Sequence, residues 1–154
     1  MTSPEQQLAA LGLKLPEVVP PVAAYVPAVR TGRYVYVSGQ VPIVDGKLTA
    51  TGKAGGEIDG AQAKELARIC ALNALAAVAS LTGSLSAITR VVKLTGFVAS
   101  APGFTGQPQV INGASELLLE LFGDAGRHAR SAVGVAELPL GAPVEVELIV
   151  EVAD

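Results

Sequence analysis

The sequence predicts an α+β fold in which a mixed β-sheet of about six strands carries two helices packed on one face. One observation behind this prediction is the C-terminal segment, residues 144–152, where apolar residues alternate with mostly acidic ones. A period of two gives a strand one apolar and one polar face. The second observation is a pair of segments, one at residues 58–82 and one that begins near Pro108. Both have the apolar content of helices that pack on the apolar face of a sheet. The length predicts a single domain over residues 1–154.

The first predicted element is a short helix over residues 3–13. Ser3 is its expected N-cap, Pro4 takes the first helical position, and Gln6 stands three residues after the cap, which is the spacing of a capping box. Three prolines between this helix and the next element predict an extended connector.

Residues 22–41 have the pattern of strand, turn and strand. The two strands are expected at residues 23–30 and 33–38, because both stretches are rich in residues that favour β-structure. The dipeptide at 45–46, Asp-Gly, is typical of a tight hairpin turn and precedes a short segment at 47–50.

The first long helix is expected over residues 58–82. Its opening half is amphipathic, and its apolar face includes Leu66 and Cys70. The closing half is apolar on every side, which predicts that it is buried on every side. Gly83 supplies the C-terminal stop.

The remaining elements alternate in type. Residues 88–98 predict a long strand, and a second helix follows with Pro108 in its first turn and Gly123 at its end. The apolar stripe of this helix is Val110, Ala114, Leu117, Leu118 and Leu121. Two further strands are expected at 131–138 and 144–152.

The face of the sheet opposite the helices must meet either water or another protein chain. Glu145 and Glu147 lie on that face in the predicted last strand. Half of all residues are hydrophobic and only 16% are charged. This balance favours burial of some apolar surface against another subunit.

Composition also argues against several classes of protein. The net charge is −3, and no run of Lys or Arg provides the positive field that nucleic acid binding requires. A single cysteine, Cys70, fits a reducing compartment, and with the one histidine, His128, it is too little for a zinc site. The uncharged stretch 69–89 is interrupted by polar residues, so we expect a packed helix and no membrane span, and the first residues lack the pattern of a signal peptide. We therefore expect a cytoplasmic protein.

Residues 130–147 resemble the signature of the RidA/YjgF family, in which an Arg-Ser-x-Val-x-Val-x-x-Leu-Pro run leads into Val/Ile-Glu-Ile/Val-Glu. Residues 25–29 and 32–42 are similar to the opening hairpin of that family. Gln62, Ala63, Asn73 and Asn112 match positions in its two helices. The resemblance spans roughly residues 22–152, which leaves residues 1–21 as an N-terminal extension of a longer-chain subgroup.

The resemblance implies a chorismate-mutase-like fold that forms a homotrimer, with three sheets in a central barrel and clefts between subunits. It implies hydrolytic deamination of reactive enamines and imines of the 2-aminoacrylate type to 2-keto acids and ammonia, as in 2-iminobutanoate/2-iminopropanoate deaminases. The expected ligand is a small carboxylate or imine, with no metal and no cofactor. An older label for the family is endoribonuclease L-PSP or translation inhibitor.

The same resemblance implies roles for five residues. Arg130 would clamp the substrate carboxylate, since a guanidinium offers two parallel N–H donors. Glu145 would hold and orient the attacking water, as general base or proton shuttle. Tyr25 and Ser38 would line the cleft. Asn112 is a substrate-binding candidate by its position, with a hydrogen bond at the helix surface or an interface as the alternative.

Other interpretations of these residues stay open. Arg130 also fits an ordinary surface or ion-paired arginine, and Glu145 fits a solvated strand residue. Tyr25 fits plain packing, Cys70 fits the core, and His128 fits a surface loop. Ala132 replaces a cysteine found in many relatives, which excludes thiol chemistry at that position. Two alternatives to the deaminase remain: a non-catalytic module that binds small carboxylates in the same clefts, and the ribonuclease of the older label, which the acidic composition disfavours.

Overall fold

The computed structural model describes residues 2–21 and 23–154. Val22, where the predicted strand–turn–strand segment starts, and Met1 lie outside the described residues. The helices and strands are α1 (Pro4–Ala10), β1 (Ala28–Thr31), β2 (Tyr34–Gln40), β3 (Ile43–Val44), β4 (Lys47–Leu48), α2 (Gly60–Thr82), β5 (Ile88–Ala99), α3 (Gln107–Phe122), β6 (Ala129–Val135) and β7 (Val144–Val152). Three short 3-10 helices, η1 (Leu85–Ala87), η2 (Gly123–Gly126) and η3 (Pro139–Gly141), connect them.

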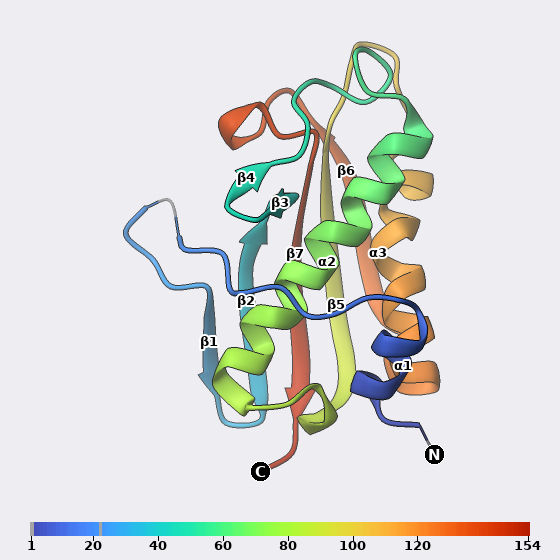
Figure 1. The fold of residues 1–154 in the computed structure, drawn as a ribbon. Coiled ribbons are helices and arrows are strands. Elements are labelled where there is room, and N and C mark those ends of the chain that lie inside the picture. The colour runs from blue at the N-terminus through green and yellow to red at the C-terminus, as the bar shows by residue number, and fades with distance from the viewer. Residues whose placement is uncertain (1, 22) are drawn as a thin grey trace.

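The predicted α+β class is confirmed. One mixed sheet has the strand order β1-β2-β7-β5-β6, and only β5 and β6 run parallel. Helices α2 and α3 lie side by side over one face of this sheet (Figure 1). The sheet has five strands, whereas about six were predicted, because β3 and β4 pair only with each other. Asp45 and Gly46 both have positive φ, as the predicted tight turn requires.

The first strand begins later than predicted. Residues 23–27 were expected to be part of it, yet pairing with β2 starts at Pro27, whose carbonyl accepts a hydrogen bond from Ser38 N at 2.9 Å. Proline has no N–H to donate, so the ladder loses a hydrogen bond at this position, and proline is common at the first residue of an edge strand. Tyr25 consequently lies in a bend and not in a strand.

The core lies between the sheet and the two long helices. Alternate residues of β7 are buried there, which confirms the predicted period of two. The helix α3 buries its predicted apolar stripe, and α2 buries Cys70, Leu75 and Val78 completely. The closing half of α2 is not buried on every side as predicted, since Leu81 in its last turn is 45% exposed.

Helices α2 and α3 pack closely because Gly113 of α3 has no side chain. A Cβ atom at this position would overlap the carbonyl oxygen of Lys64 in α2. Among the described helices, α2 alone is long and apolar enough to cross a membrane by length and composition. However, 56% of its most apolar 18-residue stretch is buried inside the fold, as is typical of a core helix.

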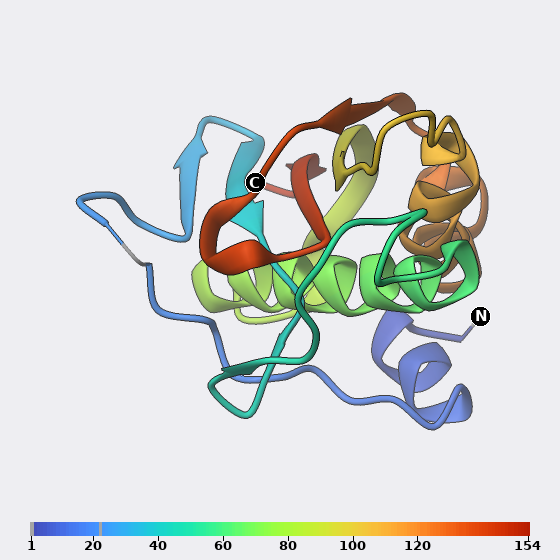
Figure 2. The ribbon, with the colours of Figure 1, turned by 90° about the horizontal axis from the view of Figure 1, so that it is seen from above.

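The N-terminal segment is part of the folded unit. The helix α1 has the predicted capping box, in which the Ser3 hydroxyl accepts from Gln6 N and the Gln6 side chain accepts from Ser3 N. After α1 the chain crosses α2 on the side away from the sheet and continues to the end of the molecule that holds β1 (Figures 1 and 2). This path places the connector beside the candidate site.

Candidate functional site

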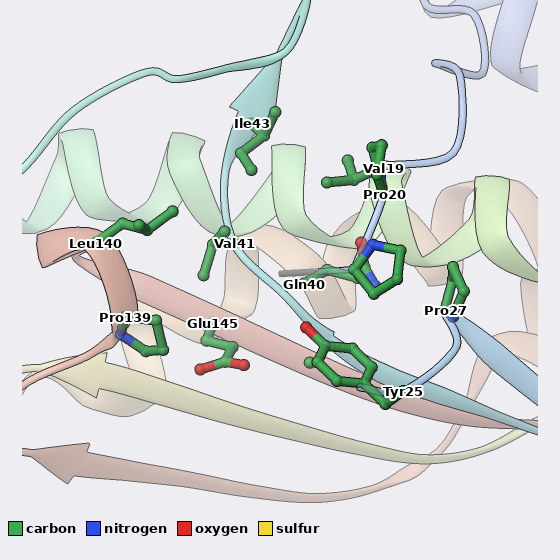
Figure 3. Close-up of a pocket in the computed structure, with 12 residues that line it drawn as sticks. Val19, Pro20, Tyr25, Pro27, Gln40, Val41, Ile43, Pro139, Leu140 and Glu145 are labelled. Carbon is green, nitrogen blue, oxygen red and sulfur yellow. The ribbon is translucent and has the colours of Figure 1, made fainter. Parts of the chain in front are cut away.

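A pocket beside β2 and β7 brings together two of the predicted site residues, Tyr25 and Glu145. Figure 3 shows both side chains directed into the same hollow. Gly39 and Gln40 of β2 form part of the wall. The rest of the lining is apolar and comes from the N-terminal connector, the loop before β1, the segment after β2 and the η3 turn: Val19, Pro20, Pro21, Pro27, Val41, Ile43, Pro139 and Leu140.

The position of Glu145 depends on a bulge in β2. The β2–β7 register shifts between Val37 and Gln40, so two residues of β2 face one residue of β7. Gly39 lies in this bulge, directly under the Glu145 side chain. A Cβ atom on residue 39 would overlap the Glu145 carboxylate, with 2.8 Å to its Cδ and 3.1 Å to its Cγ. Among the amino acids, only glycine leaves this space free for the carboxylate. The strand β2 continues through Gly39 to Gln40, whereas the sequence predicted that it ends before Gly39.

The pKa of Glu145 is raised above its ordinary value, first by burial and then by the neighbouring negative charge of Glu147. Both causes disfavour the ionised form. A carboxylate with a raised pKa accepts a proton more readily than an exposed one, which suits a general base. The combination of burial and a like charge in a pocket is also typical of functional carboxylates.

Ser38 of β2, which was predicted together with Tyr25 to line the cleft, is not among the residues that line this pocket. Its hydroxyl donates a hydrogen bond of 2.6 Å to the carbonyl of Val26, next to Tyr25. Ser38 thus fixes the loop that carries Tyr25. Gln40, which the sequence analysis missed, is almost fully buried and donates from Nε2 to Ser38 O at 3.1 Å. A long polar residue at a buried strand position was the signal that could have identified it.

Arg130 and Asn112 are in direct contact, away from this pocket. The guanidinium of Arg130 donates to Asn112 Oδ1 at 2.7 Å, to Ser115 Oγ at 3.2 Å and to the carbonyl of Pro108 at 3.3 Å. These partners are all on α3, whereas Arg130 is on the edge strand β6. Three of the five N–H donors of the guanidinium are therefore used, which leaves two for a ligand.

His128 extends this network. Its Nδ1 lies 2.6 Å from the carbonyl of Gly126, and its Nε2 lies 2.9 Å from Ser115 Oγ. A carbonyl only accepts, so Nδ1 carries the proton, and in a neutral ring Nε2 accepts from the Ser115 hydroxyl. Ser115 in turn accepts from Arg130. His128 is half-buried and helps to orient Arg130 through Ser115, whereas the sequence had indicated an ordinary surface residue.

Arg130 and Glu145 lie on opposite faces of the sheet. Arg130 is opposite Leu94 of β5, and Leu94 is opposite Leu148 of β7. Partners in register point to the same face, and both leucines are buried under the helices. Glu145 is three residues from Leu148, in register with Phe97, and so points to the open face. Within one chain, Arg130 therefore does not lie beside Glu145.

Cys70 offers no reactive thiol in this region. It is completely buried, and burial raises the pKa of its thiol well above the ordinary value, with a further contribution from Glu145. Its Sγ donates to the carbonyl of Val144 at 3.8 Å. The interpretation of Cys70 as a core residue is confirmed. Within residues 2–21 and 23–154, no group of three or more His, Cys, Asp or Glu side chains is placed to hold a metal ion.

Comparison with known proteins identifies close relatives. Residues 5–152 match the family described as "YjgF/chorismate_mutase-like, putative endoribonuclease". Protein TCP17 of Trypanosoma cruzi is 46% identical over 145 residues, which cover 94% of this chain and 91% of the relative. Two solved structures superpose over 97% of this chain. They are Atu1372 of Agrobacterium tumefaciens, a protein of unknown function (49% identity, 92% of that chain, TM-score 0.91), and a "putative endoribonuclease" of Shewanella oneidensis (35% identity, 99% of that chain, TM-score 0.94).

Proposed function

The chain belongs to the YjgF/chorismate-mutase-like family, and we propose that it hydrolyses reactive enamines and imines of the 2-aminoacrylate type to 2-keto acids and ammonia. The observation that carries this proposal is the half-buried carboxylate of Glu145, which lies over Gly39 in a largely apolar pocket with Tyr25. Its raised pKa fits a group that must take a proton from water and return it.

The chemistry asks little beyond positioning and proton transfer. An enamine first becomes an imine when its terminal carbon gains a proton and its nitrogen loses one. Glu145 then takes a proton from a water molecule while the water oxygen bonds to the imine carbon, and the nitrogen, which receives the π electrons of the C=N bond, is protonated to give a carbinolamine. Glu145 next moves the proton of the new hydroxyl group to the amine nitrogen, and as the C–N bond breaks ammonia leaves and the keto group forms. The carbon is already electrophilic, so orientation in a water-poor pocket supplies most of the required acceleration.

The substrate carboxylate requires a cation, and the pocket lining contains no Lys or Arg among its residues. Arg130 has two free N–H donors for this purpose, but within one chain it faces the other side of the sheet from Glu145. We therefore propose a composite site in a homotrimer, where Arg130 of one subunit meets the pocket of a neighbouring subunit. The open face of the sheet supports assembly, since it carries four exposed large apolar side chains: Val29, Tyr34, Tyr36 and Val133.

Two substitutions test the chemical roles. With an imino acid generated in the assay by an amino acid oxidase, Glu145→Gln should abolish accelerated ammonia release and leave binding of a small 2-keto acid intact. Arg130→Ala should weaken binding as well as turnover, by about 100-fold or more, because an ionic partner of a carboxylate is lost. Equal rates for wild type and either variant would refute the assigned role.

Mixed oligomers test the composite site. Neither Glu145→Gln nor Arg130→Ala subunits alone should be active. When the two are co-expressed in equal amounts, about one quarter of the sites should combine an intact Glu145 with an intact Arg130 from the neighbouring subunit. Recovery of activity on mixing supports a shared site, whereas two residues acting within one chain would give no recovery.

Keto acid binding, imino acid turnover and an assay of RNA cleavage separate the deaminase from its alternatives. A non-catalytic carboxylate-binding module would bind 2-keto acids without any turnover that depends on Glu145. A ribonuclease, the activity in the name of the Shewanella oneidensis relative, would cleave RNA after rigorous removal of contaminating nucleases and would lose that activity in Arg130→Ala. The net charge of −3 gives RNA no attractive surface field.

A further inference from the structure

The N-terminal segment, residues 3–21, contributes a wall to the pocket. We infer that this wall selects substrates with an aliphatic side chain longer than a methyl group. The inference rests on the proposed function, because it takes the reacting carbon to lie beside Glu145. Val19, Pro20 and Pro21 of the segment line the same pocket as Glu145, although they precede it by more than a hundred residues in the chain.

The segment is anchored far from the pocket. Leu8 of α1 is buried in the core cluster, and Glu5 binds the start of the turn after α2. The Glu5 carboxylate accepts hydrogen bonds from the Ser84 hydroxyl and from both the backbone N–H (3.1 Å) and the hydroxyl (2.7 Å) of Ser86. Burial alone would raise the pKa of Glu5, but these hydrogen bonds lower it to about 2. The anchor is therefore charged at neutral pH.

The path from this anchor to the pocket is also fixed. Leu13 and Leu15 are half-buried against the core cluster, so the chain is held down after α1. It then crosses the outer side of α2 (Figure 2). Pro16 and Pro20 each lock one φ angle, which leaves this stretch fewer conformations to lose on docking. A wall built this way keeps its place without ligand.

The pocket is chemically divided. Tyr25, Gln40 and Glu145 supply its polar groups, whereas Val19, Pro20 and Ile43 lie together on the side away from Glu145 in Figure 3. A substrate whose reacting carbon meets Glu145 would direct its side chain towards these apolar groups. A polar or charged side chain would lose its hydration there without gaining a partner. An aliphatic side chain would gain contact area in proportion to its length.

Val18 and Val19 provide a matched pair of variants. Both valines are half-buried in the same connector, but only Val19 lines the pocket. Imino acids with methyl, ethyl and isobutyl side chains are supplied by an amino acid oxidase, and kcat/KM is measured for each. In Val19→Ala, the ratio of isobutyl to methyl activity should fall by roughly threefold to tenfold, since two methyl groups leave the wall. In Val18→Ala it should stay at the wild-type value.

Binding distinguishes a failure of this inference from a failure of the proposed function. The 2-keto acids with the same three side chains are titrated calorimetrically into each protein. An affinity that rises with side-chain length in wild type and Val18→Ala, but not in Val19→Ala, supports the wall. If no imino acid is turned over in that case, only the proposed deaminase activity is refuted. The inference is overturned if the wild-type protein binds all three keto acids equally. It is also overturned if the ratio of isobutyl to methyl affinity is unchanged in Val19→Ala, whether or not deamination occurs.

The anchor gives a second, remote test. Glu5→Gln removes the charge that holds three hydrogen bonds but touches nothing in the pocket. Limited proteolysis should cut within the first 21 residues faster in this variant, and the isobutyl preference should fall as in Val19→Ala. If the segment loosens while the preference remains, the wall has no part in selection.

Discussion

Gly39→Ala is the most specific perturbation of the proposed site. Its φ lies outside the left-handed region, so alanine strains no backbone at this position, and the effect is steric only. The new methyl group would occupy the space of the Glu145 carboxylate, whose Cδ and Cγ lie 2.8 and 3.1 Å from the ideal Cβ position. Glu145 can escape by changing its rotamer, because its carboxylate is the end of a flexible side chain.

Stability and activity should therefore respond very differently. An unfavourable rotamer costs about 1 kcal/mol, which for a chain of this size lowers Tm by about 2–4 °C. Displacement of a catalytic group by about 1 Å costs about 100-fold in rate. Deamination of an imino acid and thermal unfolding by circular dichroism measure the two quantities. Gly60→Ala is the control, since a Cβ there meets nothing within 4 Å.

A double-mutant cycle decides whether the clash is the cause. In a Glu145→Ala background the carboxylate is absent, so Gly39→Ala should lose most of its cost in stability. If Gly39→Ala retains wild-type activity, or destabilises both backgrounds equally, the close approach of Gly39 and Glu145 does not position the proposed general base.

Glu147→Gln should shift the acid limb of the pH–activity profile to lower pH. Only ionised Glu145 accepts a proton, so activity rises as the pH passes through the pKa of Glu145. Burial and then the charge of Glu147 raise this pKa, and the variant removes the second cause. Glu145 stays buried in this variant, so the limb should move only part of the way. An unchanged acid limb would show that the charge of Glu147 does not raise the pKa of Glu145. Gly113→Ala should destabilise the protein by about 1–3 kcal/mol, because the new Cβ meets the Lys64 carbonyl and the helices must separate. Gly60→Ala should be neutral or stabilising in the same thermal unfolding experiment, and equal Tm values for the two variants would contradict the packing argument.

Elements with a strong local pattern were predictable from the sequence. The alternation in β7, the apolar stripe of α3, the capping box at Ser3 and the turn at 45–46 all form as expected. In each case the interactions that decide the structure lie within a few residues of one another along the chain. The extent of β1 was less predictable, because its start depends on which carbonyl of the loop pairs with β2.

Part of the candidate site could be predicted from the sequence, and part of it could not. Resemblance to a family was enough to select Tyr25 and Glu145, which the fold brings into one pocket. It could not show that Ser38 supports a loop instead of lining that pocket, since the hydroxyl's partner is set by how the loop before β1 folds back.

The sequence by itself determined the fold class and the acidic strand that carries Glu145, because periodicity is a property of neighbouring residues. Only the tertiary structure decided that Gly39 lies beneath that glutamate and that Val19 comes to the same pocket from the other end of the chain. It also decided that Arg130 faces away from Glu145. These relations depend on strand order, register and a bulge, which arise when distant segments pair and which no local pattern encodes.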